Sequence, residues 1–247
     1  MIRRALPGAV LALATIVAWA AAHHLPLAAR GLVAFLLVPL PFFMHWQARA
    51  SAATASTMPR TGLYLSSALL LWALAAITAA CAAASHIGSG VLGLMALPPA
   101  TLAAWTAGTC AAGLAVLVLG HRLGIAETPL LRHLIPVTAL EKFSFSALSL
   151  TAGFAEELVF RGFLLWALTQ ASASVALAVV VSSILFGVMH AYQDVAGAGR
   201  AAILGAVLAA PVVATGSVVP AMLAHAAIDL TSGLVLARWL IGPAREG

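Results

Sequence analysis

The sequence contains very little charge. Only 8% of its 247 residues are Asp, Glu, Lys or Arg, whereas 63% are hydrophobic and the mean hydropathy is +1.08. A soluble domain carries about 25% charged residues, so this chain has too few to cover a water-exposed surface. The composition excludes an ordinary soluble enzyme and a disordered chain. It favours a polytopic membrane protein whose apolar stretches are surrounded by lipid.

Cysteine is also scarce, and the basic residues are not clustered. Cys81 and Cys110 both fall within apolar stretches, and two such residues make neither a disulfide framework nor a metal-ligand pattern. The formal net charge is +5, but no basic cluster with interleaved aromatic residues is present. We therefore expect no nucleic-acid partner. In a membrane protein, basic residues instead mark cytoplasmic loops.

Recurring apolar stretches predict an all-α fold, namely a polytopic membrane helix bundle. About 20 apolar residues cross a bilayer, so we expect about eight transmembrane helices in a single integral-membrane domain, residues 1–247. The first stretch is interpreted as an uncleaved span and not as a signal peptide. Pro39, Pro41 and Pro211 fall inside expected spans and predict kinks. The expected spans are about 5–22, 27–46, 62–85, 101–119, 143–168, 174–191, 201–215 and 218–241.

The distribution of Lys and Arg favours eight spans with both termini in the cytoplasm. In this topology ten basic residues lie in cytoplasmic segments and only Arg30 lies outside, while Arg161 falls within the fifth span. Such an excess is what the positive-inside rule describes. The ten cytoplasmic residues are Arg3, Arg4, Arg49, Arg60, Arg122, Arg132, Lys142, Arg200, Arg238 and Arg245.

A few ionisable residues fall inside the expected spans. They are Glu156, Glu157 and Arg161 in the fifth span, His190 in the sixth, and His225 with Asp229 in the eighth. A charged side chain near the centre of a span costs about 2.5–3.5 kcal/mol on insertion scales, so such residues are functional candidates. We expect the catalytic helices within residues 143–241. The other acidic residues, Glu127, Glu141, Asp194 and Glu246, are expected in loops or in the tail.

Helical spacing predicts how these side chains are arranged. Glu157 and Arg161 are four residues apart and can pair on one helix face. Glu156 is rotated by about 100° from Glu157, so it can face another group. If Arg161 holds Glu157 ionised, Glu156 stays available as a proton acceptor. His225 and Asp229 share a face in the same way.

The residue types then indicate a reaction. A base, a cavity inside a bundle and two histidines that can hold water, stabilise an oxyanion or protonate a leaving amine suggest water-dependent acyl hydrolysis within the membrane. The sequence contains neither the HExxH pattern of a zinc protease nor the GxGD pattern of an aspartyl dyad.

Three motifs in this order resemble the CPBP family, which comprises CAAX prenyl endopeptidases and bacteriocin-processing intramembrane proteases and is also called Abi. The motifs are EExxxR (Glu156, Glu157, Arg161), FxxxH (Phe186, His190) and HxxxD (His225, Asp229). The resemblance covers about residues 154–229, and it implies an eight-helix fold and peptide-bond hydrolysis in a membrane-embedded or lipidated substrate.

The resemblance also implies roles for individual residues. Glu156 would activate the attacking water with support from Glu157 and Arg161, and His190 would help to hold that water. His225 and the residue at position 229 would supply the oxyanion hole. Phe186 is expected to pack, with a weak role in binding substrate.

Asp229 departs from the family pattern, since the better-studied eukaryotic members carry Asn at this position. An ionised Asp cannot donate a hydrogen bond to an oxyanion. We expect Asp229 instead to orient His225 through a hydrogen bond, as a carboxylate orients a catalytic imidazole. No cofactor is expected, but the family has been described both as metalloproteases and as glutamic proteases. A divalent metal therefore stays open, with Glu156, His190 and His225 as Zn²⁺ ligands.

Two other functions remain open. The embedded acids and histidines could relay ions or protons in a transporter subunit, although they gather in three helices without an inverted repeat. The chain could also be a non-catalytic scaffold or immunity protein with the same fold. The expected partners are a membrane protein or peptide substrate and the lipid bilayer. Lys142 is the single lysine among 12 basic residues and alanine is abundant, which favours a bacterial inner membrane.

Overall fold

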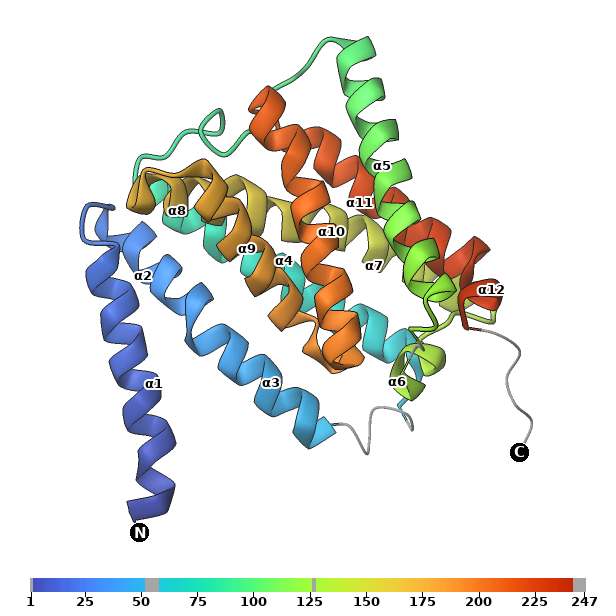
Figure 1. Ribbon diagram of the computed structural model, residues 1–247, viewed down its shortest axis with the longest axis horizontal. Coiled ribbons are helices and arrows are strands. Elements are labelled where there is room, and N and C mark those ends of the chain that lie inside the picture. Colours follow the sequence, from blue (N-terminus) through green and yellow to red (C-terminus); the bar gives the residue numbers. More distant parts are fainter. Residues whose placement is uncertain (1, 52–57, 126–127, 242–247) are drawn as a thin grey trace.

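A computed structural model describes residues 2–51, 58–125 and 128–241, and within these ranges the chain forms helices and no strands (Figure 1). The predicted all-α class is therefore confirmed. Glu127, Arg245 and Glu246 lie outside the described residues, and the side chains of Arg3, Arg4 and Arg49 are likewise not described.

The helices vary in length, and several are divided by short turns. Their bounds are α1 Ile2–Ala21, α2 Leu27–Leu37, α3 Pro39–Ser51, α4 Arg60–Ala84, α5 Pro99–Arg122, α6 Pro129–His133, α7 Ala139–Glu157, η2 Leu158–Leu164, α8 Leu165–Ser172, α9 Val175–Met189, η3 Ala191–Gln193, α10 Asp194–Thr215, α11 Val219–Leu230, η4 Thr231–Val235 and α12 Ala237–Ile241.

Among the described residues, five helical segments are long and apolar enough to cross a membrane. They are Leu27–Gln47, Arg60–Ala84, Pro99–Arg122, Ala139–Ser172 and Ala191–Thr215. Three shorter apolar helices accompany them: Val10–Ala21, Val175–Met189 and Val219–Val235. The protein is therefore a multi-pass membrane protein with five candidate spanning helices.

Prolines shape the first half of the bundle. The kink expected at Pro39 is a break in the helix, because α2 ends at Leu37 and α3 starts at Pro39. Pro41 lies in the first turn of α3, where a missing N–H is tolerated, and not in a helix interior as expected. Pro99 occupies the first turn of α5, and Pro211 lies inside α10.

Two acidic residues lie in helices and not in the loops where they were expected. Thr138 caps α7 by accepting from the N–H of Glu141 at 3.2 Å, and the Glu141 carboxylate accepts from the N–H of Thr138 at 2.9 Å. This reciprocal capping box starts the helix four residues before the predicted boundary. Asp194 begins α10.

Two π-helical turns interrupt the expected regular spans. The span predicted at 143–168 consists of α7, the π-turn η2 and α8, and the span predicted at 218–241 consists of α11, the π-turn η4 and α12. A π-turn widens the helix by one residue and occurs frequently at functional sites. Both turns start close to residues of the motifs. Glu157 immediately precedes η2, and Asp229 lies two residues before η4.

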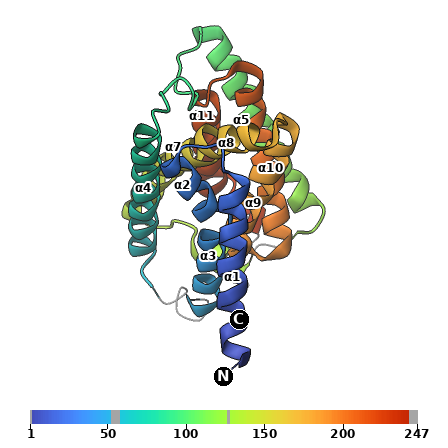
Figure 2. The same cartoon turned by 90° about the vertical axis from the view of Figure 1, so that its left-hand side faces the viewer.

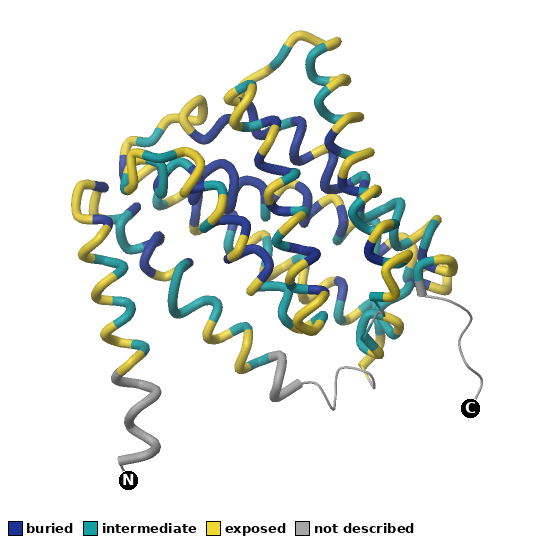
Figure 3. The backbone as a smooth tube through the Cα atoms, in the orientation of Figure 1, coloured by how far each residue is buried: buried dark blue, intermediate teal, exposed yellow. Residues whose placement is uncertain are grey.

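The helices that carry the motifs lie in the middle of the bundle. Helix α7 packs between α4 and α11, α9 packs against α10, and α5 packs against α10 and α11. Figure 2 shows α4 on one outer side and α9 with α10 on the other, with α7 and α11 between them. Buried residues are concentrated in this central part (Figure 3). In α1, at the edge, residues 10–21 are either exposed or only partly buried.

A glycine allows α7 and α11 to approach closely. A Cβ atom at Gly153 would lie 2.7 Å from the carbonyl oxygen of Met222 and 2.8 Å from the backbone nitrogen of Ala226. Both atoms belong to the backbone of α11 and cannot move aside alone. Small residues at such contacts bring membrane helices together, so Gly153 sets the distance between two of the motif helices.

We expect Gly153→Ala to destabilise the protein, because the added methyl group would force α7 and α11 apart. Overpacking of this kind costs about 1–3 kcal/mol, so the melting temperature in detergent should fall by several degrees. Gly62→Ala is the matched control, since a Cβ at that helical position meets nothing within 4 Å. Equal melting temperatures for the two variants would contradict the close packing.

Candidate active site

The first and third motifs meet at one buried carboxylate oxygen. Oε1 of Glu157, the last residue of α7, accepts from Nη1 of Arg161 at 2.9 Å and from Nδ1 of His225 at 2.8 Å. Arg161 lies in η2 and His225 in α11. The whole Glu157 residue is 0% exposed, Arg161 is 2% and His225 is 7%. One oxygen therefore connects two helices and a π-turn inside the protein.

Arg161 extends this connection to α9 and α10. Its Nη2 donates to the carbonyl oxygen of Gly205 in α10 at 2.9 Å, and its Cζ lies 4.3 Å from the ring centroid of Phe186 in α9. A Cβ at position 205 would lie only 3.0 Å from Nη2, so glycine leaves room for the guanidinium. Sequence reasoning missed Gly205, because a backbone carbonyl acceptor has no signature in the sequence.

Glu156 lies beside this network without joining it. It is partly buried, and its Oε2 atom is buried without a hydrogen-bond partner among the described residues. The charges of His225, Glu157 and Arg161 all act on its carboxylate. The adjacent carboxylates thus have different surroundings: Oε1 of Glu157 accepts from Arg161 and His225, whereas no hydrogen bond to Glu156 occurs among the described residues, although Oε2 of Glu157 also lacks a partner.

His190 caps the C-terminal end of α9. Its Nδ1 is 2.8 Å from the carbonyl oxygen of Phe186; a carbonyl only accepts, so Nδ1–H donates. In neutral His190 the other nitrogen, Nε2, is then an acceptor. The rings of Phe186 and His190 lie 4.6 Å apart, and the charges of His225 and Asp229 act on His190.

Phe186 is an internal part of this cluster. It is 3% exposed, and its ring contacts that of Phe160 in an edge-to-face arrangement with 5.2 Å between centroids. Its ring also lies 6.0 Å from that of His225. The packing role expected of Phe186 is therefore confirmed, and the ring separates Arg161 from His190.

The arrangement expected of Asp229 is wrong. Its Oδ2 lies 3.7 Å from Nε2 of His225, which is longer than a hydrogen bond, and its side chain is 36% exposed. The carboxylate that orients His225 is Glu157, which lies 68 residues away in sequence and binds the other ring nitrogen. Spacing within α11 correctly places Asp229 near His225 but cannot show which nitrogen is bound from another helix.

The residues suggested as zinc ligands do not form a ready metal site. Within residues 2–51, 58–125 and 128–241, no three His, Cys, Asp or Glu side chains are grouped so that they could hold a metal ion. Glu156, His190 and His225 therefore do not match a three-ligand zinc site. We derive no reaction step through a metal.

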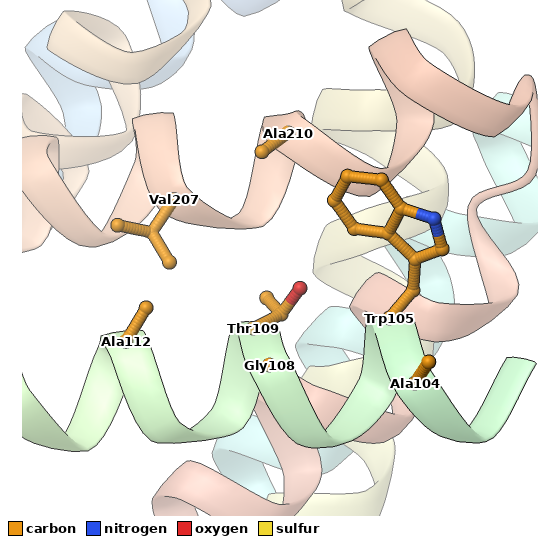
Figure 4. Close-up of a pocket in the computed structure, with 7 residues that line it drawn as sticks. All are labelled: Ala104, Trp105, Gly108, Thr109, Ala112, Val207 and Ala210. Atoms are coloured by element: carbon orange, nitrogen blue, oxygen red, sulfur yellow. The ribbon is translucent and has the colours of Figure 1, made fainter. Parts of the chain in front are cut away.

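A separate cavity of about 420 Å³ lies on another part of the bundle, between α5 and α10. Figure 4 shows Ala112 of α5 opposite Val207 of α10, and Trp105 of α5 on the side of Ala210. None of the motif residues lines this cavity. It is apolar and lacks acidic and basic side chains, so it offers no groups for hydrolysis.

We expect Glu157→Gln to destabilise the protein strongly, because it leaves Arg161 and His225 buried without a counter-charge. Removing one partner of a buried pair costs about 3–5 kcal/mol. Glu141→Gln is the matched control, since the Glu141–Arg60 pair is partly exposed and contributes about 0–1 kcal/mol. Thermal unfolding in detergent would compare the variants, and similar losses for both would contradict this view of Glu157.

Comparison with known proteins agrees with the motifs. Residues 138–231 match a protein-family model described as type II CAAX prenyl endopeptidase, Rce1-like. The match starts at the cap of α7 and ends just after Asp229, so it contains all three motifs. No curated protein and no solved structure matches the chain. The resemblance is thus confirmed over residues 138–231, which match the Rce1-like type II CAAX prenyl endopeptidase (CPBP) family, a family of peptidases.

Proposed function

We propose that this protein is an intramembrane endopeptidase in which Glu156 activates water for attack on a peptide bond of a membrane-embedded or lipidated substrate. The family is one of intramembrane proteases, and the geometry of the two glutamates supports the assignment of the base. Oε2 is buried without a partner in both carboxylates, but Oε1 of Glu157 accepts from Arg161 and His225, whereas no hydrogen bond to Glu156 occurs among the described residues. This contrast is the observation that carries the proposal.

In the ground state, Glu156 and His190 would hold the water molecule between them. The ionised Glu156 carboxylate accepts one hydrogen of the water, and Nε2 of His190 accepts the other. His190 can do so because its Nδ1 proton is engaged by the Phe186 carbonyl. The water oxygen then keeps a lone pair directed at the substrate carbonyl.

In the attack, the water oxygen forms a bond to the carbonyl carbon and its proton passes to Glu156. The carbonyl oxygen becomes an oxyanion, which needs a hydrogen-bond donor. His225 is suited to this role: Nδ1 is fixed by Glu157, so a proton on Nε2 is left to donate to the oxyanion. The Asp229 carboxylate lies 3.7 Å from Nε2 and balances the imidazolium charge.

Collapse of the tetrahedral intermediate would complete the reaction. The C–N bond breaks, and the leaving nitrogen takes the proton that Glu156 received from water. Glu156 is thereby returned to its ionised form, and the products are a carboxylic acid and an amine. Every proton is carried by side chains of this chain, as general acid–base catalysis requires.

We infer that the three shorter apolar helices also enter the membrane and complete a bundle of eight helices with both termini in the cytoplasm. Val10–Ala21, Val175–Met189 and Val219–Val235 fall within the first, sixth and eighth spans expected from the sequence. The asymmetry of Lys and Arg supports this orientation. The composition supports a bacterial inner membrane as its location.

The proposed function predicts that membranes containing the intact protein have peptide termini that membranes with Glu156→Gln lack. The amide keeps the shape of the side chain but cannot take a proton from water. Terminal peptides from the two membrane proteomes would be labelled isotopically and compared by mass spectrometry. Glu141→Gln is the control, since it also changes an acid of α7 to an amide, at a distance from the motifs.

The outcomes separate the candidate functions. New termini that depend on Glu156 and not on Glu141 support a peptidase and identify the cleaved bond. Identical termini in all three membranes, with normal insertion of each variant, would overturn the proposal. If Glu156→Gln also complements loss of the protein in cells, the result would favour a scaffold.

The proposed topology predicts opposite labelling of two single cysteines, after Cys81 and Cys110 have been replaced by serine. Cysteine in Gly90→Cys, in the loop between α4 and α5, should react with a membrane-impermeant thiol reagent in intact cells. Cysteine in Leu123→Cys, just after α5, should react only after the membrane is opened. The reverse pattern, or equal labelling of both, would contradict the topology.

A further inference from the structure

A short turn after the FxxxH motif carries an aromatic residue that sequence reasoning did not single out. The turn η3 directly follows His190 and contains Tyr192, whose ring lies 5.9 Å from that of His190. On its other side the His190 ring contacts Phe186. Phe186 is 3% exposed and Tyr192 is 37% exposed, so this series of rings runs from the interior to an open side of the site.

The hydroxyl group of Tyr192 keeps a proton to donate. Its oxygen accepts from Nε2 of Gln193 at 3.2 Å, and no acceptor for the phenolic proton occurs among the described residues. The negative charges of Glu156 and Asp229 act on this hydroxyl. It therefore lies within electrostatic reach of acidic residues from both α7 and α11, which carry the other motifs.

The backbone that holds Tyr192 is constrained. Asp194 ends the turn with φ 74° and ψ −176°, a conformation that only glycine adopts readily. Its Oδ1 accepts from the N–H of Gly197 at 2.8 Å, which fixes the strained residue to the first turn of α10. Strain of this kind persists where the surrounding structure determines the geometry, and it is concentrated at active sites.

The site needs such a donor because most of its other N–H groups are already engaged. Nδ1 of His225 donates to Glu157, Nδ1 of His190 donates to Phe186, and both terminal nitrogens of Arg161 have acceptors. The remaining Nε of Arg161 has no hydrogen-bond partner among the described residues, but this atom is buried, so a substrate oxygen cannot reach it. Asp229, when ionised, only accepts. The polar side chains of the motifs thus leave Nε2 of His225 as a single donor for the oxyanion.

We propose that Tyr192 is a further catalytic residue, whose phenolic O–H donates a hydrogen bond to the carbonyl oxygen of the scissile peptide. This inference rests on the proposed function. As the water oxygen bonds to the carbonyl carbon and Glu156 takes the proton, the carbonyl oxygen gains negative charge. Tyr192 stabilises that charge together with His225 and keeps its own proton throughout. Oxyanion holes formed by two donors commonly use hydroxyl and ring N–H groups.

The test uses full-length protein in detergent with a peptide that spans the bond identified by the comparison of membrane proteomes. Tyr192→Phe keeps the ring beside His190 and removes only the hydroxyl. We expect kcat to fall about 100-fold, as on loss of one oxyanion donor, with KM changed less than about twofold. Tyr64→Phe is the matched control, because the chain has two tyrosines and the Tyr64 hydroxyl instead donates to Leu134 at 2.8 Å.

A second measurement separates catalysis from folding. A phosphinic analogue of the peptide carries a tetrahedral oxyanion, and Tyr192→Phe should bind it about 100-fold more weakly while binding the uncleaved peptide unchanged in a Glu156→Gln background. Tyr64→Phe should lower the melting temperature without changing kcat. If Tyr192→Phe unfolds, Gln193→Leu replaces it as the test variant. It keeps the tyrosine but removes the group that donates to its hydroxyl, and it should lower kcat by less than the factor of about 100 expected for Tyr192→Phe.

Failure of this inference can be distinguished from failure of the proposed function. If Glu156→Gln abolishes cleavage but Tyr192→Phe keeps kcat within about twofold of the intact protein, Tyr192 is not an oxyanion donor and the peptidase assignment stands. Equal loss of affinity for the phosphinic analogue and for the uncleaved peptide would also overturn the inference, since it would indicate a role in binding alone. If Glu156→Gln retains full cleavage, the proposed function itself fails.

Discussion

The arrangement of the motifs depends on the hydrogen bonds that converge on Oε1 of Glu157. This oxygen accepts from Arg161 and His225, and Arg161 in turn donates to Gly205, so α7, η2, α10 and α11 are joined through one buried cluster. Burying these charges is costly in a low dielectric, and removing any partner leaves another charge unpaired. The helices can therefore occupy only positions that keep the three contacts together, and this requirement fixes His225 relative to Glu156.

Much of this site could be predicted from the sequence because its members occur at fixed helical spacings. The pairing of Glu157 with Arg161 follows from a four-residue interval, and the scarcity of charge makes every embedded acid conspicuous. The contact between Glu157 and His225 could not be predicted in this way. It joins residues 68 positions apart, and it depends on how α7 and α11 pack. The four-residue spacing in α11 predicts a hydrogen bond from His225 to Asp229, but His225 bonds Glu157, which the packing of α7 against α11 brings close to it.

The fold shows a similar division between local and distant determinants. Apolar stretches and prolines are local signals, and they place most helix ends within a few residues. The Thr138–Glu141 capping box is also local, but the expected span starts only at residue 143, with Glu141 in a loop. The π-turns η2 and η4 have no such signal, since a widened turn is stable only when neighbouring helices support it. Gly205 was equally hidden, because its contribution is a carbonyl group and the space for a guanidinium, which exist only once α10 packs against η2.

The site has a buried side and an open side, and their polar groups differ in how they are bonded. On the buried side, Glu157, Arg161 and His225 are bonded to one another, and Oε2 of Glu157 and Nε of Arg161, which lack partners, are buried out of reach of a substrate. On the open side, Oε2 of Glu156, Nε2 of His190 and the hydroxyl of Tyr192 each retain an unused acceptor or donor. Phe186 contacts both Arg161 and His190. The buried cluster of Glu157, Arg161 and His225 thus holds the helices in place, while the reactive groups on the open side keep free donors and acceptors. Preorganised catalysis inside a membrane requires both.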